Sequence, residues 1–192
     1  MANETTNKIL EAAFEIVAQN KISGTRMHLI AKEAGMVQSN LHYYYPTKND
    51  LMIALLDSIQ ERFTQKRMSS VDLDEKAFAE NLQGLFYEKK DDILNHKKID
   101  YVQFDFWVQG TVNPEIRIKF KDAFDIWINN IKEVLKQQPG LEDNKSVHYN
   151  MLPHLIVSIM MGASMQYLMD EEKFDLDDYF AAAEKMILDF LK

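Results

Sequence analysis

Apolar residues recur at helical spacing from the start of the chain. In the first segment they predict a helix that ends near Asn20, and either Thr5 or Thr6 can cap its N-terminus. The apolar positions of this helix are Ile9, Ala13, Ile16 and Val17. The chain therefore begins with an amphipathic helix.

Two short helices are predicted next, over about residues 25–34 and 37–45. Gly35 separates them, and Pro46 ends the second because the residue before a proline is disfavoured in a helix. Three helices thus account for the first 45 residues.

Longer helices are predicted for the rest of the chain. Thr47 caps one that extends to about Ser69, with Leu51, Leu55, Ile59 and Phe63 at i, i+4 spacing. The later ones are expected over about residues 74–95, 97–109, 114 to Pro139-Gly140, 146–169 with a bend or start at Pro153, and from 177 onward. The pattern predicts an all-α fold with a three-helix N-terminal head and a larger helical domain.

Composition agrees with this fold class. Six Gly and four Pro are too few to punctuate the many short strands of a β-sandwich or barrel. The absence of Cys excludes a disulfide framework, a thiolate nucleophile and Cys-ligated metal sites, and it fits a reducing, cytoplasmic location.

Neither the start of the chain nor its long apolar run suggests membrane targeting. The first 14 residues lack the basic and apolar regions of a secretory signal. The long apolar run from Met151 to Met169 contains Pro153 and His154, which suits a buried helix better than a membrane span. No membrane partner is expected.

The net charge of −8 is distributed unevenly. Residues 1–67 hold eight Lys and Arg against seven Asp and Glu, whereas the remainder holds 14 against 23. This asymmetry is compatible with a DNA-facing head on an acidic body, but charge alone favours an ordinary acidic surface.

Residues 27–44 have the spacing of a helix-turn-helix. Two helices that cross over a tight turn need a small residue at their closest approach, a turn residue that tolerates positive φ, and an apolar anchor under the second helix. Ala31, Gly35 and Leu41 fill these three places. An ordinary helical hairpin would satisfy the same spacing.

The continuation Leu41-His42-Tyr43-Tyr44-Tyr45-Pro46-Thr47-Lys48-Asn49-Asp50-Leu51 resembles the signature of the TetR family of transcriptional regulators. The resemblance covers about residues 9–56. It implies a DNA-binding domain over residues 1–46 and an effector-binding and dimerisation domain over 47–192. Val37 stands where the family commonly has a capping Ser, so the recognition helix is expected to begin near Gln38 or to borrow Ser39.

The resemblance and the chemistry of the side chains together assign candidate roles at the head. Amide side chains address adenine edges in the major groove, and hydroxyl and basic groups reach phosphates. The expected base readers are Gln38, Ser39, Asn40 and Tyr43. The expected phosphate contacts are Thr25, Arg26, His42, Tyr44 and Lys48. For Tyr45, packing beneath the head is preferred.

The second domain is rich in aromatic and Met residues that fill a core or line an effector cavity. For any one of them core packing is favoured, whereas the resemblance implies an effector site among them. The candidates are Phe86, Phe104, Trp107, Phe124, Trp127, Met160, Met161 and Met165.

Signatures of catalysis are missing from the sequence: HExxH, GxSxG, GxGxxG and GxxxxGK[ST] are all absent. No enzyme activity, cofactor or metal is expected. The prediction is a homodimeric repressor, paired through its last two helices and released from a palindromic operator in double-stranded DNA by a small-molecule effector. The alternative is a helical small-molecule-binding or enzyme-like protein that does not bind DNA.

Overall fold

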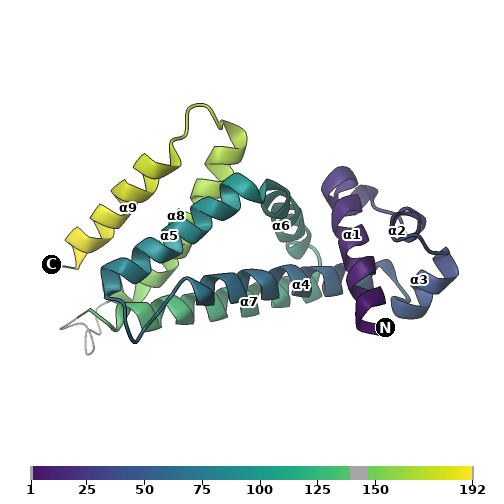
Figure 1. Ribbon diagram of the computed structural model, residues 1–192, viewed down its shortest axis with the longest axis horizontal. Helices are drawn as coiled ribbons and strands as arrows, with labels where there is room; N and C mark the ends of the chain where they lie inside the picture. The colour runs from purple at the N-terminus through teal and green to yellow at the C-terminus, as the bar shows by residue number, and fades with distance from the viewer. Residues whose placement is uncertain (1, 139–146, 192) are drawn as a thin grey trace. The chain divides into compact units, whose positions relative to one another are not determined.

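The structure is a computed structural model that describes residues 2–138 and 147–191 (Figure 1). The described residues form helices and connecting loops without a strand, which confirms the all-α prediction. The helices are α1 (Ala2–Gly24), α2 (Met27–Glu33), α3 (Gln38–Tyr44), α4 (Lys48–Ser69), α5 (Phe78–Asn95), α6 (Lys97–Gly110), α7 (Pro114–Leu135), α8 (Val147–Met169) and α9 (Leu176–Phe190).

Contacts divide the chain into two compact units. The first contains Met1–Arg62 and Lys98–Ala123, and the second contains Phe63–Lys97 and Phe124–Lys192. Helices α4 and α7 therefore contribute to both units. The division of DNA-binding from effector-binding function after residue 46 stays a prediction.

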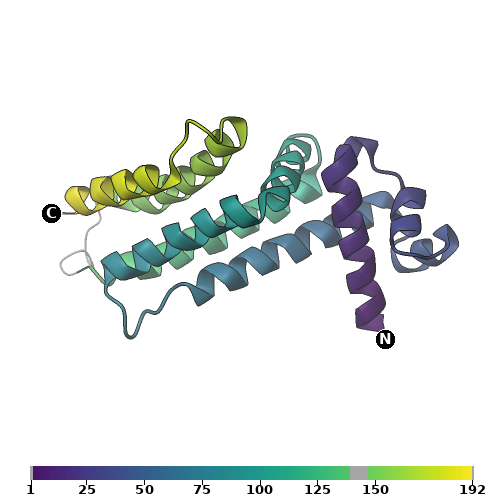
Figure 2. The same ribbon diagram turned by 45° about the horizontal axis from the view of Figure 1, so that its top comes forward.

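In the first unit α1 contacts α2, and α2 contacts α3 (Figure 2). The predicted apolar stripe of α1 is buried: Ile9, Ala13, Ile16 and Val17 are at most 7% exposed. The helix begins at Ala2, so the expected cap at Thr5 or Thr6 is wrong. Glu4 lies in its first turn, where a negative charge favours the helix N-terminus.

The regular part of α1 ends near Asn20, as predicted. Lys21 follows with φ 60° and ψ 166°, a conformation that residues with a side chain rarely adopt. The carbonyl of Lys21 accepts hydrogen bonds from the backbone N–H of Thr25 at 3.1 Å and from its hydroxyl at 2.7 Å. These bonds hold a kink at the end of α1.

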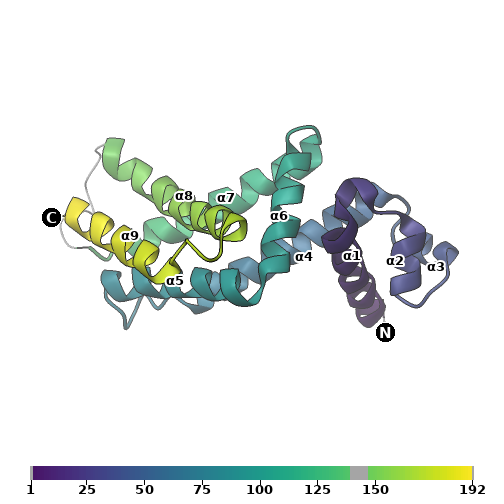
Figure 3. The same ribbon diagram turned by 90° about the horizontal axis from the view of Figure 1, so that it is seen from above.

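In the second unit α5, α8 and α9 contact one another, and Figure 3 shows α9 beside α8. Their core includes the buried side chains Leu82, Ile156, Met160 and Phe180. Pro153 lies inside α8, which begins at Val147, so a helix start at Pro153 is wrong. The expected start at residue 146 and the Pro139-Gly140 break lie outside the described residues.

Two helix starts differ from the predictions because nearby carboxylates cap other positions. Helix α5 begins at Phe78, whereas Asp74 was expected: the Asp72 carboxylate accepts from the backbone of Asp74 at 3.1 Å and holds that segment in a turn. Helix α9 begins at Leu176 because Asp175 accepts from two backbone N–H groups of its first turn.

The segment Tyr149–Met169 of α8 is long and apolar enough to span a membrane, judged by length and composition. Its side chains Leu152, Ile156, Val157 and Met160 are buried in the core of the second unit. These contacts are those of a central helix in a helical bundle.

Candidate DNA-binding site and effector cavity

The turn between α2 and α3 has the geometry that the sequence predicted. Ala31 is 2% exposed, Leu41 is fully buried, and Gly35 adopts φ +63°. The backbone N–H of Met36 donates to the Ala31 carbonyl at 2.9 Å, which closes the turn over the end of α2. The predicted helix-turn-helix is therefore present.

The recognition helix α3 begins at Gln38, as expected from the loss of a capping side chain at Val37. Val37 is extended, with φ −78° and ψ 148°, and its side chain makes no cap hydrogen bond. Because the helix has only seven residues, its position depends on the buried anchor Leu41.

The side chains Gln38, Ser39, Asn40, His42 and Tyr43 of α3 are all exposed. We call them the recognition surface. Tyr43 is the most prominent, with 81% of its surface exposed. Such a row on a short helix over a tight turn fits the major groove of DNA.

Two other tyrosines adjoin this surface. Tyr44 is half-buried, and its ring meets that of Tyr43 edge-to-face with centroids 5.4 Å apart. Tyr45 is also half-buried, and this burial raises the pKa of its phenol. The packing preferred for Tyr45 from the sequence agrees with its burial.

The imidazole of His42 links Gln38 to the start of the next loop. Its Nδ1 lies 3.0 Å from the Pro46 carbonyl, which only accepts, so Nδ1 carries the proton. With the proton on Nδ1, Nε2 accepts from the Gln38 amide, 3.2 Å away. His42 thereby orients Gln38 within the recognition surface.

The two residues after α1 differ in exposure. Thr25 is fully buried, and its hydroxyl is engaged with the Lys21 carbonyl. Arg26 is exposed, and its guanidinium donates to the carbonyls of Ser23 at 2.8 Å and Thr25 at 3.1 Å. Of this pair, Arg26 has the more accessible group for a phosphate.

Ile22, in the kink of α1, is bonded at both its backbone groups by distant side chains. The Lys48 ammonium of α4 donates to its carbonyl at 2.5 Å, and Asp105 of α6 accepts from its N–H at 2.5 Å. Burial and the nearby Arg26 lower the pKa of Lys48, against the raising effect of Asp105. The group expected at a phosphate is thus directed toward the protein's own backbone.

Polar bonds also join α4 to α7 within the first unit. Asn49 donates to Glu115 at 2.6 Å and accepts from Asn113 at 2.9 Å. The predicted cap of α4 is confirmed, because the Thr47 hydroxyl accepts from the Asp50 N–H while the Asp50 carboxylate accepts from the Thr47 N–H.

The candidate effector-binding side chains are placed in different surroundings. Those that belong to the core of the second unit or pack against it are Phe86, Phe124, Trp127, Met160 and Met161. Met165 is 54% exposed on α8. Phe104 and Trp107 lie on α6 in the first unit, and Trp107 is 50% exposed.

One of these candidates, Trp127, lines a cavity in the second unit. The cavity volume is about 30 Å³. The lining residues are Arg67, Met68, Val71, Leu73, Leu85, Trp127, Asn130, Ile131 and Val134. Arg67 and Asn130 are not among the candidate effector-binding residues predicted from the sequence. For Arg67 a signal was available, because this charged residue follows the apolar stripe of α4.

Three side chains that line this cavity, Arg67, Trp127 and Asn130, carry nitrogen donors. Arg67 is only 9% exposed, and its guanidinium lies over the Trp127 ring, 4.5 Å from the centroid. Among the described residues, Arg67 Nε, Trp127 Nε1 and Asn130 Nδ2 are buried without an acceptor. A buried donor left unpaired costs about 1–3 kcal/mol, so such a group favours binding an acceptor.

Acidic groups on α5 lie near Arg67. Burial, followed by hydrogen bonding and repulsion from Asp92, raises the pKa of Glu88 to about 8 despite Arg67 and Lys66. The raised pKa favours the protonated form of Glu88 near neutral pH. Asp92 forms an ion pair with the Lys66 ammonium, which also contacts Asp91 at 2.8 Å.

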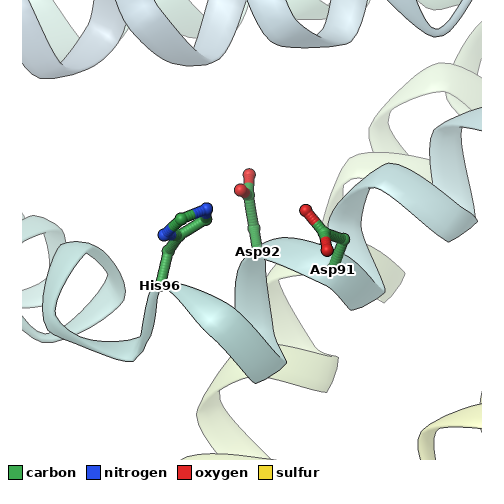
Figure 4. A group of neighbouring side chains, drawn as sticks. All are labelled: Asp91, Asp92 and His96. Carbon is green, nitrogen blue, oxygen red and sulfur yellow. The ribbon is translucent and has the colours of Figure 1, made fainter.

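Asp91, Asp92 and His96 gather at the end of α5, with ligand atoms within 4.8 Å of one another (Figure 4). The ammonium of Lys66 already bonds both carboxylates. The Lys66 ammonium therefore already neutralises the carboxylates that a metal ion would need as ligands. The cluster is explained as an ion-pair network.

Comparisons with known proteins agree with the head geometry. Residues 9–55 match the family model for bacterial regulatory proteins of the tetR family. The fatty acid metabolism regulator protein of Bacillus subtilis is 25% identical over 173 residues, which is 88% of this chain and 86% of that protein.

Solved structures extend the likeness to the whole fold. A TetR transcription regulator from Haloarcula marismortui superimposes with a TM-score of 0.82 at 20% identity, covering 95% of this chain and 96% of that one. FadR from Bacillus subtilis in complex with stearoyl-CoA gives a TM-score of 0.74 at 21% identity, with 96% of each chain covered.

The helix-turn-helix, its signature and the family-model match place residues 9–55 in the tetR family of bacterial regulatory proteins. These findings support a DNA-binding transcriptional regulator. The alternative of a helical protein without DNA binding is set aside.

Proposed function

We propose that this protein is a cytoplasmic, homodimeric repressor that a small effector releases from a palindromic operator. The observation that carries the proposal is the recognition surface, an exposed polar row on a short helix anchored by Leu41. Amides at Gln38 and Asn40 supply the donor and acceptor pair that reads adenine in the major groove.

The apolar surface of α8 and α9 supports a two-fold dimer. Large apolar side chains are 47–80% exposed there: Met151, Leu155, Met165, Met169, Met186 and Phe190. Pairing with the same surface of a second copy would bury them in an isologous interface. A two-fold dimer presents two recognition helices to two half-sites, which accounts for a palindromic operator.

Effector release is proposed to work by a shift of population. An effector that binds better to a dimer with wrongly spaced heads lowers the fraction competent for the operator. Asp105 and Lys48 both bind the backbone of Ile22, so movement of α4 or α6 changes the support of α1. The names of the relatives support a fatty-acyl compound as the first effector to test.

A gel-shift experiment with DNA flanking the encoding gene tests the proposal. We expect a retarded complex of one dimer on one operator, lost in the Gln38→Ala, Asn40→Ala double variant. The matched control is Gln65→Ala on α4, outside the recognition surface. Failure to find any bound fragment, in flanking DNA or by selection from random sequence, would contradict the proposed function.

A further inference from the structure

The cavity in the second unit has a polar end and an apolar remainder. The polar end is formed by Arg67, Trp127 and Asn130, which we call the donor triad. Apolar walls are contributed by Val71, Leu85, Ile131 and Val134, and the exposed Met68 and Leu73 also line the cavity. A ligand with a polar end and an apolar body matches this division.

The donor triad presents N–H groups from two helices. Trp127 and Asn130 are three residues apart on α7 and therefore share a face, while Arg67 lies in the last turn of α4. Each contributes a buried nitrogen with no acceptor among the described residues. Only an acceptor satisfies all three groups.

The charge at the triad selects among acceptors. The acidic groups that act on Arg67 are Glu88, whose pKa is raised, and Asp92, which pairs with Lys66. Arg67 itself makes no ion pair in the part of the chain that the structure describes. Its charge also lies over the face of Trp127, where a cationic ligand would otherwise bind. The site therefore disfavours a cation and favours an anion.

We propose that the donor triad receives the anionic oxygen group, a carboxylate or a phosphate, of an effector with an apolar body. The cavity of about 30 Å³ has room for roughly two water molecules, which is the size of such a group. The apolar body would extend along the cavity walls toward Met68 and Leu73. Met68 is unbranched and adapts to different chain shapes.

The proposal rests on the proposed function but names a site that operator binding does not require. Binding is measured by calorimetry on the full-length protein, with four probes that share a ten-carbon chain and are kept below micelle formation: decanoate, decyl phosphate, decanol and decyltrimethylammonium. We expect decanoate or decyl phosphate to bind at least tenfold more tightly than decanol, and the cation not to bind. Which anion binds more tightly identifies the oxygen group.

A variant on α7 connects this preference to the triad. Asn130→Asp replaces a donor with an acceptor of the same size, and we expect it to weaken binding of the preferred anion at least tenfold. Asn129→Asp adds the same charge at the adjacent exposed position and should change affinity less than twofold. Trp127→Phe keeps an aromatic ring but removes the N–H donor. We therefore expect this variant to bind the preferred anion at least threefold more weakly.

Helical content by circular dichroism confirms that each variant is folded. Equal affinity for decanol and decanoate, or unchanged anion binding in both Asn130→Asp and Trp127→Phe, would overturn the proposal. So would failure of both anions to bind wild-type protein that still retards its operator, a result that leaves the repressor function intact.

Discussion

Lys48 donates a hydrogen bond to the carbonyl of Ile22, so the first residue of α4 supports the kink at the end of α1. The kink contains Lys21 in a strained conformation, and strained backbone persists only where the surroundings hold it. This contact gives Lys48 a structural role in addition to the phosphate contact predicted from the sequence.

Lys48→Met should weaken binding to all DNA sequences alike and lower the free energy of unfolding by about 1–2 kcal/mol, because the Ile22 carbonyl loses its charged donor. Gel shifts on operator and unrelated DNA, with chemical denaturation, measure both effects. Lys32→Met, an exposed lysine on α2, is the control. Wild-type stability in Lys48→Met would contradict the structural role.

The salt dependence of operator binding separates the two roles of Lys48. If the ammonium also reaches a phosphate, its removal lowers the slope of log affinity against log salt by roughly two per dimer. We expect that decrease. An unchanged slope would refute the phosphate contact and leave the bond to Ile22 as the function of this side chain.

His42→Phe should reduce discrimination between operator and mutated operator, because the Gln38 amide loses the acceptor that orients it. We expect a loss on the order of 1 kcal/mol, smaller than the 1–3 kcal/mol expected for Gln38→Ala. Affinity measured on a set of single-base operator variants tests this. Retained preference at every position in both variants would rule out base reading by Gln38.

Stability should depend on pH through Glu88. The pKa of Glu88 is raised to about 8 in the folded protein, above the 4.5 of the free side chain. The protonated form of Glu88 therefore favours folding. Its contribution to the free energy of unfolding is complete below pH 4.5 and is lost as pH rises toward 8. The loss is no more than about 1.4 kcal/mol per pH unit.

Glu88→Gln removes this titration. Between pH 5 and 8 the wild-type free energy of unfolding should fall relative to that of the variant, by a total on the order of 1–3 kcal/mol after allowance for the neighbouring charges. Denaturation series at several pH values measure the difference. Glu75→Gln, at an exposed position, is the control, and parallel curves for wild type and Glu88→Gln would disprove the assignment.

A charge on the exposed apolar surface of α9 should separate the dimer. Met186 is 66% exposed, so Met186→Glu leaves the core unchanged but places a carboxylate in the proposed interface. We expect a folded monomer by sedimentation at micromolar concentration and at least tenfold weaker operator binding. Tyr87→Glu, on the exposed face of α5, should remain dimeric.

A charged substitution at Ala163 or Ala183 would be a less informative test of the dimer interface. Both side chains are at most 5% exposed in the core of the second unit, so a carboxylate there disrupts the fold of each subunit. If Met186→Glu sediments as a dimer with full operator affinity, the interface does not use this surface of α9.

The sequence alone determined the features that depend on neighbouring residues. Ala31, Gly35 and Leu41 predicted the helix-turn-helix because its turn is closed by local backbone geometry. Thr47 and Asp50 predicted the start of α4 for the same reason, since a cap involves residues three positions apart.

Tertiary structure decided the features that join distant parts of the chain. Lys48 and Asp105 lie 26 and 83 positions from Ile22 in the sequence, yet both bond its backbone. The donor triad likewise combines residues of α4 and α7. Helical periodicity reports which face of a helix is apolar, but it does not specify which helices meet there. Only packing places Arg67 beside Trp127 and buries Glu88 near Asp92, because desolvation and pairing depend on surroundings supplied by other helices.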